Sequence, residues 1–121
     1  MRVWHCCHTA GCELGVQPDS ALTCSFFQRL PPGLPDVPVY LLDPMLATGV
    51  SAVRALDHLK RAGARHLELV CLVAAPEGLA ALEAEHADVP VWTAAIDREL
   101  DENAYIRPGL GDAGDRVFGT L

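Results

Sequence analysis

The order of apolar and polar residues along the chain predicts strands and helices in alternation. Three short apolar runs, at residues 39–42, 67–75 and 89–96, have the length and composition of strands. The second run is almost continuously apolar, which predicts a central parallel strand buried on both faces. Pro90, near the start of the third run, predicts that this strand lies at an edge of the sheet.

Helical periodicity fills the intervals between these runs. From residue 51 to residue 61, apolar residues recur at the spacing of a helix that packs one face against a sheet. Gly63 is expected just beyond the end of this helix, and Pro76 at the first position of a second helix. Alternating strands and helices imply right-handed crossovers, so we expect an α/β fold built on a parallel sheet.

The first 25 residues show no steady period, and we expect an irregular segment there, followed by one domain over residues 26–121. Several residues of metal-ligating types gather in this segment: His5, Cys6, Cys7, His8 and Cys12. Adjacent cysteines rarely point at one metal ion, so we interpret the group as part of an irregular terminus and predict no metal-ligating side chains.

The composition of the chain limits the classes of function that the protein can have. Half of the 121 residues are hydrophobic, which indicates a folded domain, and the net charge of −7 argues against nucleic acid or an anionic membrane as a partner. No apolar run approaches membrane-spanning length, and the first residues do not resemble a signal peptide. The five cysteines are odd in number and lack a CxxC spacing, which suggests reduced thiols and a cytoplasmic protein.

The stretch from Asp43 to Ser51, DPMLATGVS, connects the first predicted strand to the first predicted helix. In such a connection, backbone N–H groups and the helix dipole favour a bound phosphate. Thr48 adds a hydroxyl donor, Gly49 permits close approach of the backbone, and Asp43 is expected at the carboxyl end of the strand, where ligands bind. An ordinary connection with Thr48 or Ser51 as the helix N-cap is the alternative, and the pattern alone does not decide between them.

A second candidate loop lies near the end of the chain, at residues 105–119. Gly109, Gly111 and Gly114 allow its backbone to bend closely round a flat ligand. The alternative is a glycine-rich surface loop in which Asp112 and Asp115 are simply solvated.

Taken together, the two loops resemble those of a known family. The stretch at residues 43–51 resembles the PRPP-binding loop of type I phosphoribosyltransferases, and its form DPMLATG is similar to that of uracil phosphoribosyltransferases. The resemblance continues through residues 74–78, 94–97 and 105–116. It implies a parallel-sheet type I phosphoribosyltransferase core, incomplete at the N-terminus, and the pyrimidine-salvage reaction of uracil with PRPP to give UMP and pyrophosphate.

The resemblance also implies a role for each matching residue. Asp43 would contact the ribose hydroxyls, and Asp112 would lie beside the PRPP site and stabilise developing positive charge; these two are the catalytic candidates. The PRPP-binding residues would be Asp43, Pro44, Met45, Leu46, Ala47, Thr48, Gly49, Val50, Ser51 and Asp112. Uracil would be bound, largely through main-chain groups, by Ile106, Gly111, Asp112 and Ala113. Mg²⁺ would accompany the leaving pyrophosphate.

The chain departs from the family pattern in several places. Family members carry a long N-terminal half and upstream arginines that contact PRPP, whereas Arg2 is the only basic residue before Arg29 here. Val50 stands where a second glycine is usual. Two alternatives to an active enzyme follow: a binding protein for UMP or uracil that cannot hold pyrophosphate, and a gene fragment that folds poorly. Exposed apolar surface and an open sheet edge predict self-association as a homo-oligomer.

Overall fold

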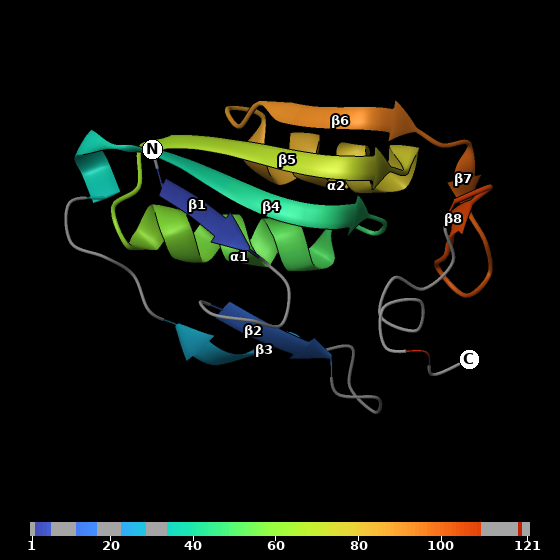
Figure 1. The fold of residues 1–121 in the computed structure, drawn as a ribbon, viewed down its shortest axis with the longest axis horizontal. Helices are drawn as coiled ribbons and strands as arrows, with labels where there is room; N and C mark the ends of the chain where they lie inside the picture. The colour runs from blue at the N-terminus through green and yellow to red at the C-terminus, as the bar shows by residue number, and fades with distance from the viewer. Residues whose placement is uncertain (1, 6–11, 17–22, 29–33, 110–118, 120–121) are drawn as a thin grey trace.

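The centre of the structure, a computed structural model, is a sheet of four parallel strands in the order β1–β4–β5–β6 (Figure 1). The structure describes residues 2–5, 12–16, 23–28, 34–109 and 119. The four strands are β1 (Arg2–His5), β4 (Pro38–Leu46), β5 (His66–Ala74) and β6 (Val91–Ile96). The α/β fold and the parallel sheet are therefore confirmed, as is the edge position of the strand that follows Pro90.

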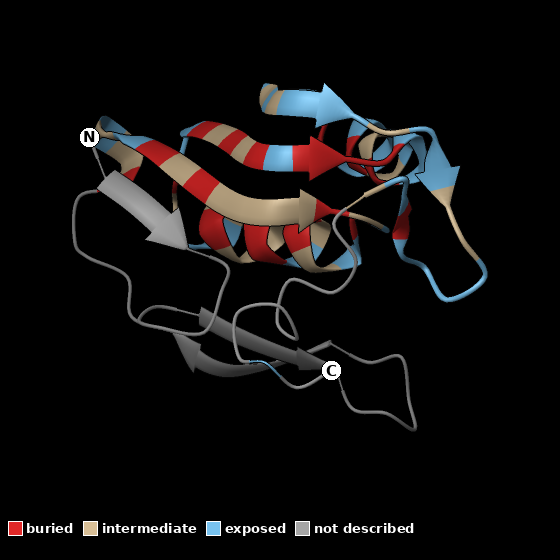
Figure 2. Cartoon of the chain, turned by 45° about the vertical axis from the view of Figure 1, so that its right-hand side comes forward, coloured by how far each residue is buried: buried red, intermediate tan, exposed pale blue. Residues whose placement is uncertain are grey.

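Two helices, α1 (Val50–Arg61) and α2 (Pro76–His86), lie behind the sheet in the view of Figure 1 and cover the same face of it. The predicted apolar stripe of the first helix is buried against the sheet (Figure 2): Ala52, Ala55, Leu56 and Leu59. Pro76 opens α2 and Gly63 follows the C-cap residue of α1, both as predicted. None of the described helices has the length and apolarity that a membrane span requires.

The first predicted strand is longer than the apolar run from which we predicted it. We expected it to end at Leu42 with Asp43 at its carboxyl end, but β4 continues to Leu46 and Asp43 lies inside it. Pro44 explains why the pattern misled, because a proline argues against a central strand. In the described register β1 pairs with β4 up to Leu42, and β5 pairs with β4 on both sides of Pro44, at Asp43 and Met45.

The expectation of an irregular segment at residues 1–25 was wrong in two places. β1 pairs with β4, and β2 (Cys12–Val16) forms an antiparallel pair with β3 (Thr23–Gln28), which spans the expected boundary at residues 25 and 26. Three smaller elements complete the described chain: the 3-10 helix η1 (Leu34–Asp36) and the strands β7 (Glu99–Leu100) and β8 (Ile106–Arg107). β7 lies in the acidic stretch at residues 97–102.

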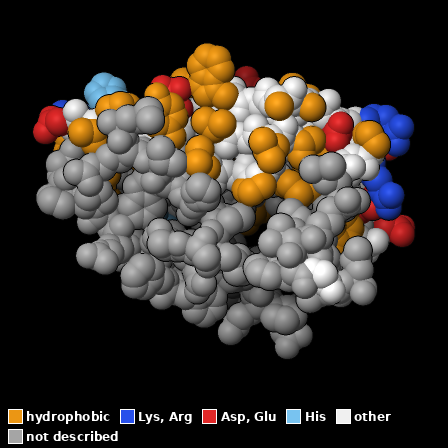
Figure 3. Space-filling model, viewed as in Figure 1, with side chains coloured by type: hydrophobic (Ala, Val, Ile, Leu, Met, Phe, Trp, Pro, Cys, Tyr) orange, Lys and Arg blue, Asp and Glu red, His pale blue; other side chains and the backbone are white. Residues whose placement is uncertain are grey.

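The face of the sheet opposite the helices carries exposed apolar side chains. Leu72 on β5 is 63% exposed, and Trp92 and Ile96 on β6 are each 60% exposed. Figure 3, drawn from this side, shows hydrophobic side chains gathered over β4, β5 and β6. The prediction that the central strand is buried on both faces was therefore wrong for the face that carries Leu72.

Candidate functional site

The first candidate loop is the short turn at residues 47–49, between the end of β4 and the start of α1. Gly49 is the N-cap residue, with a positive φ of 79° that favours glycine, and α1 has no side-chain cap. The alternative in which Thr48 or Ser51 caps the helix is thus not the arrangement found. Thr48 is exposed, and the first turn of α1 carries no acidic residue, so this helix end is suited to an anion.

The backbone of this turn lies directly on the first turn of α2. A Cβ atom added at Gly49 would come within 2.9 Å of the Gly78 carbonyl oxygen. In return, a Cβ atom added at Gly78 would collide with the carbonyl oxygen of Ala47 and come within 3.0 Å of that of Leu46. Two facing glycines therefore fix the height of the turn above α2, and no larger residue fits at either position without movement.

Asp43 is a half-buried carboxylate just before the turn. Its Oδ1 accepts a hydrogen bond from the backbone N–H of Met45 at 3.2 Å. Burial raises the pKa of Asp43 from 3.8 to about 6, and the hydrogen bond from Met45 opposes this rise only in part. Near neutral pH the site therefore holds a negative charge at some cost in folding free energy, which is a common property of functional carboxylates.

The second candidate loop begins beside the first. Ile106, on β8, is 2% exposed and forms a buried cluster with Val73 and Ala75. Met45 and Ala47, from the phosphate-site stretch, pack against the same cluster. Figure 1 shows β7 and β8 beyond the carboxyl ends of β5 and β6, where the turn after β4 also lies. The structure therefore brings Ile106 together with the first loop, whereas Gly111, Asp112 and Ala113 lie outside the described residues.

Three carboxylates that we did not predict as site residues hold this second region in place: Asp97, Glu77 and Asp101. Asp97, just after β6, accepts the backbone N–H of Gly109 at 2.9 Å through Oδ2. Glu77, in the first turn of α2, accepts the N–H of Leu100 at 3.0 Å through Oε1. In the sequence, Asp97 follows a predicted strand and Glu77 follows Pro76, and these positions are the features that could have drawn attention to them. Neither position predicts a hydrogen bond to a distant loop.

Asp101 closes the turn between β7 and β8. Its Oδ1 accepts the N–H groups of Asn103 at 2.9 Å and Tyr105 at 3.0 Å, and its Oδ2 pairs with the Arg107 guanidinium at 2.6 Å. The bond from the Tyr105 N–H is the main reason why the pKa of Asp101 lies below its usual value. The turn that leads into Ile106 is thus organised around one carboxylate.

An Asp101→Ala variant should loosen this turn without unfolding the sheet. We expect the Tyr105 amide proton to exchange at least about tenfold faster, because its acceptor is removed. Hydrogen exchange followed by mass spectrometry checks this, with the exposed neighbour substitution Glu102→Ala as the control. Equal protection of Tyr105 in both variants would contradict the role given to Asp101.

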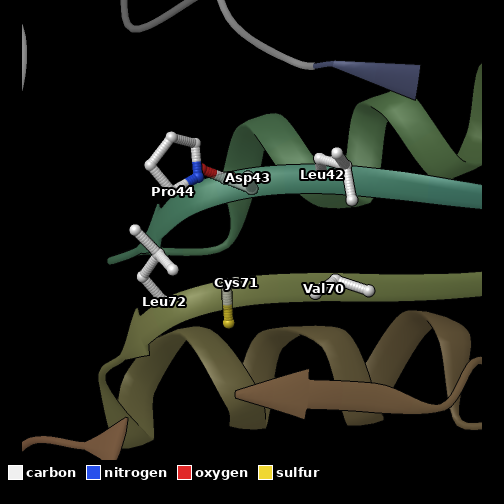
Figure 4. Close-up of a pocket in the computed structure, with 6 residues that line it drawn as sticks. All are labelled: Leu42, Asp43, Pro44, Val70, Cys71 and Leu72. Atoms are coloured by element: carbon white, nitrogen blue, oxygen red, sulfur yellow. The ribbon is translucent and has the colours of Figure 1, made fainter. Parts of the chain in front are cut away.

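The structure also contains an open pocket of about 230 Å³ on the face of the sheet away from the helices (Figure 4). It is lined by Leu42, Asp43, Pro44, Val70, Cys71 and Leu72. Most of this lining is apolar and suits a hydrocarbon side chain better than a phosphate. We therefore place the candidate phosphate site at the turn after β4 and not in this pocket.

Comparison with known proteins decides the family. The family model described as uracil phosphoribosyltransferase matches residues 5–120. The chain belongs to the uracil phosphoribosyltransferase family. It is 54% identical over 110 residues to the uracil phosphoribosyltransferase of Salinibacter ruber, a match that covers 89% of this chain and 52% of the relative. The corresponding protein of Rhodococcus opacus is 50% identical over 103 residues, covering 85% of this chain and 49% of the relative.

A solved structure has the same fold as this chain over most of its length. The AQ2163 protein from Aquifex aeolicus superposes with a TM-score of 0.81 at 34% sequence identity, over 88% of this chain and 51% of that chain. The chain thus spans about half the length of the curated uracil phosphoribosyltransferases that it matches.

Proposed function

We propose that this chain supplies the UMP-binding part of a uracil phosphoribosyltransferase, which converts uracil and PRPP to UMP and pyrophosphate in pyrimidine salvage. One observation carries the proposal: Ile106 shares a buried cluster with Met45 and Ala47. A sugar-phosphate loop and a base loop must meet at one cleft to bind a nucleotide. The start of each loop contacts the same few side chains at the carboxyl ends of the strands, as ligand sites in parallel sheets require.

In the proposed site, the turn at residues 47–49 and the N-terminus of α1 bind the 5′-phosphate through backbone N–H groups and the Thr48 hydroxyl. Asp43, when ionised, accepts hydrogen bonds from the ribose hydroxyls and favours the positive charge that develops on the sugar as pyrophosphate leaves. Main-chain groups from Ile106 onward read the edge of uracil. Cytosine presents an acceptor at N3 and a donor at position 4, the reverse of uracil at both positions, so it leaves buried groups unpaired and is rejected.

Mg²⁺ enters this proposal as part of the substrate, bound to the diphosphate of PRPP. Mg²⁺ keeps several waters and usually takes one or two protein carboxylates together with substrate phosphates. Among the described residues, no three His, Cys, Asp or Glu side chains are grouped so that they could hold a metal ion. Asp43 is the described carboxylate placed to meet it, and Asp112 is the second candidate. The ion neutralises charge on the departing pyrophosphate.

Two further proposals concern the setting of the protein. The odd number of cysteines, of which Cys71 is buried and free, suits a reducing compartment such as the cytoplasm. The strand β6 ends the four-stranded sheet and offers an edge through which copies of the chain could assemble as a homo-oligomer.

Calorimetric titration with UMP tests the proposed phosphate loop. A Thr48→Val variant should lose about tenfold in UMP affinity, because a hydrogen bond to a charged phosphate is removed. Thr93→Val is the matched control, since the Thr93 hydroxyl bonds the carbonyl oxygen of Ala95 and lies on β6. Equal affinity of the Thr48 variant and the wild type would contradict a phosphate site at this turn.

Turnover distinguishes the enzyme from a protein that only binds the nucleotide. UMP formation from uracil and PRPP with Mg²⁺ is measured beside UMP binding on the same preparation. We expect UMP binding to be retained better than turnover in these 121 residues, because both proposed UMP loops lie within them, whereas Arg2 is their only arginine or lysine before Arg29. Turnover equal to that of a full-length relative, and lost in Asp112→Ala, would contradict this expectation.

A further inference from the structure

The first turn of α2 contacts both candidate loops, and its contact with the turn after β4 is close. The backbone N–H of Ala75, the N-cap residue of α2, donates to the carbonyl oxygen of Leu46 at 2.9 Å. Gly78 lies so near the turn that a Cβ atom added at Gly49 would come within 3.3 Å of the Gly78 Cα. The turn after β4 is therefore held at one height above the start of α2.

Glu77 extends from the same helical turn to the second region. Its Oε1 accepts the backbone N–H of Leu100, on β7, at 3.0 Å. This hydrogen bond is the largest reason why the pKa of Glu77 lies below its usual value. The carboxylate is therefore ionised at neutral pH, and a hydrogen bond to an ionised acceptor is stronger than one between neutral groups.

Leu100 passes this constraint on to Ile106, the first of the residues proposed to bind uracil. The two residues are register partners in the antiparallel pair of β7 and β8. Leu100 also packs against the buried cluster that Ile106 forms with Val73 and Ala75. Because packed side chains of this kind have little free space, Leu100 and Ile106 can move only together.

We propose that Glu77 is a positioning residue for the base: it fixes β7 on the helical turn that also supports the phosphate turn, and thereby sets the separation of the two loops. This inference rests on the proposed function. In a nucleotide, one ribose joins the phosphate to the base, so the two loops must have the matching separation to bind UMP together. Ribose 5-phosphate carries the sugar phosphate without a base and needs only the first loop.

Calorimetric titrations with UMP and with ribose 5-phosphate separate these two requirements. A Glu77→Ala variant should bind UMP about tenfold more weakly than the wild type, because the charged acceptor that fixes Leu100 is removed. Its affinity for ribose 5-phosphate should change by less than about twofold, since the phosphate turn keeps its contacts with Gly78.

Two matched variants make the test specific. Glu77→Gln keeps a side-chain oxygen of the same reach and loses only the charge, so it should recover most of the affinity for UMP. Glu83→Ala removes an exposed carboxylate from the same helix and should leave both affinities unchanged. Equal weakening of the two ligands in Glu77→Ala would assign Glu77 a general role in the stability of α2 and would overturn the proposal. Equal losses in the alanine and glutamine variants would also overturn it, because the charge at the helix N-terminus would then explain the effect.

Amide hydrogen exchange followed by NMR tests the same proposal without a ligand. The Leu100 amide proton should exchange at least about tenfold faster in Glu77→Ala than in the wild type, and close to the wild-type rate in Glu77→Gln. Unchanged exchange in Glu77→Ala would overturn the proposal even if UMP binding were weaker. A wild-type chain that binds neither UMP nor ribose 5-phosphate would contradict the proposed function, and the exchange rate of Leu100 would then decide separately whether Glu77 fixes β7.

Discussion

A Gly78→Ala variant should lose about 2–3 kcal/mol of unfolding free energy, because the new methyl group has no room. Its Cβ would collide with the carbonyl oxygen of Ala47 and lie 3.1 Å from Cγ of Leu46. Glycine-to-alanine changes inside helices normally stabilise, by roughly 1 kcal/mol, so the expected sign is opposite to that of helix propensity. Either α2 must shift or the turn after β4 must rise, and both movements displace the proposed phosphate site.

Urea unfolding followed by circular dichroism measures the loss, and UMP titration of the folded variant measures the effect on the turn. Ala80→Gly is the matched control, because Ala80 is an exposed residue of the same helix. It should cost about 1 kcal/mol through propensity alone and leave UMP affinity unchanged. A Gly78→Ala variant as stable as the wild type would show that the turn does not rest on α2 as closely as the distances require.

The sequence predicted those parts of the fold that depend on local patterns. The stripe of α1, the proline at the start of α2 and the edge position of β6 each follow from a few neighbouring residues. The parallel order of the sheet follows from the alternation of elements. These predictions succeeded because the preference of the local sequence and the packing of the whole fold agree.

The failures all involve contacts between distant parts of the chain. The short strand β1 has no periodicity of its own and is defined by its pairing with β4. Pro44 argued against a strand, but β4 runs through it and pairs with the distant strand β5 on both sides of it, at Asp43 and Met45. Leu72 belongs to a continuously apolar run, a pattern that predicts burial on both faces of the sheet. The described helices pack against the opposite face, and Leu72 is exposed.

The candidate site was predictable where a motif carries its own geometry. The strand, turn and helix around residues 47–49 are present, with Gly49 at the one position that needs a positive φ. The bonds that hold the second region could not be predicted. The bond from Gly109 to Asp97 and that from Leu100 to Glu77 span 12 and 23 residues, and no spacing rule links such partners. The placement of Ile106 beside Met45 likewise depends on the whole fold.

An Asp43→Asn variant should be more stable than the wild type above pH 6 and should bind UMP less tightly. The pKa of Asp43 is raised by burial to about 6, so the folded state holds the proton more tightly than the unfolded chain, whose value is near 3.8. For a group shifted in this direction, the stabilising contribution is complete below pH 3.8 and is lost as the pH rises through 6. The loss at pH 8 is on the order of 2–3 kcal/mol.

Asparagine keeps an oxygen that can accept the Met45 N–H but carries no charge to desolvate. Thermal unfolding of both proteins from pH 4 to pH 8 should therefore show curves that separate as the pH rises, with the variant higher by about 1–3 kcal/mol at pH 8. Other carboxylates titrate in both proteins, so their effects cancel in the difference. Asp36→Asn, an exposed substitution, is the control and should change stability by less than about 0.5 kcal/mol.

UMP titration at pH 8 distinguishes a carboxylate that binds the nucleotide from one that is only buried. If Asp43 accepts hydrogen bonds from the ribose hydroxyls, removing its charge should weaken UMP binding about tenfold while the fold becomes more stable. Opposite signs for stability and affinity are expected where a buried charge is kept for binding. A variant that gains stability and binds UMP as the wild type does would remove Asp43 from the site.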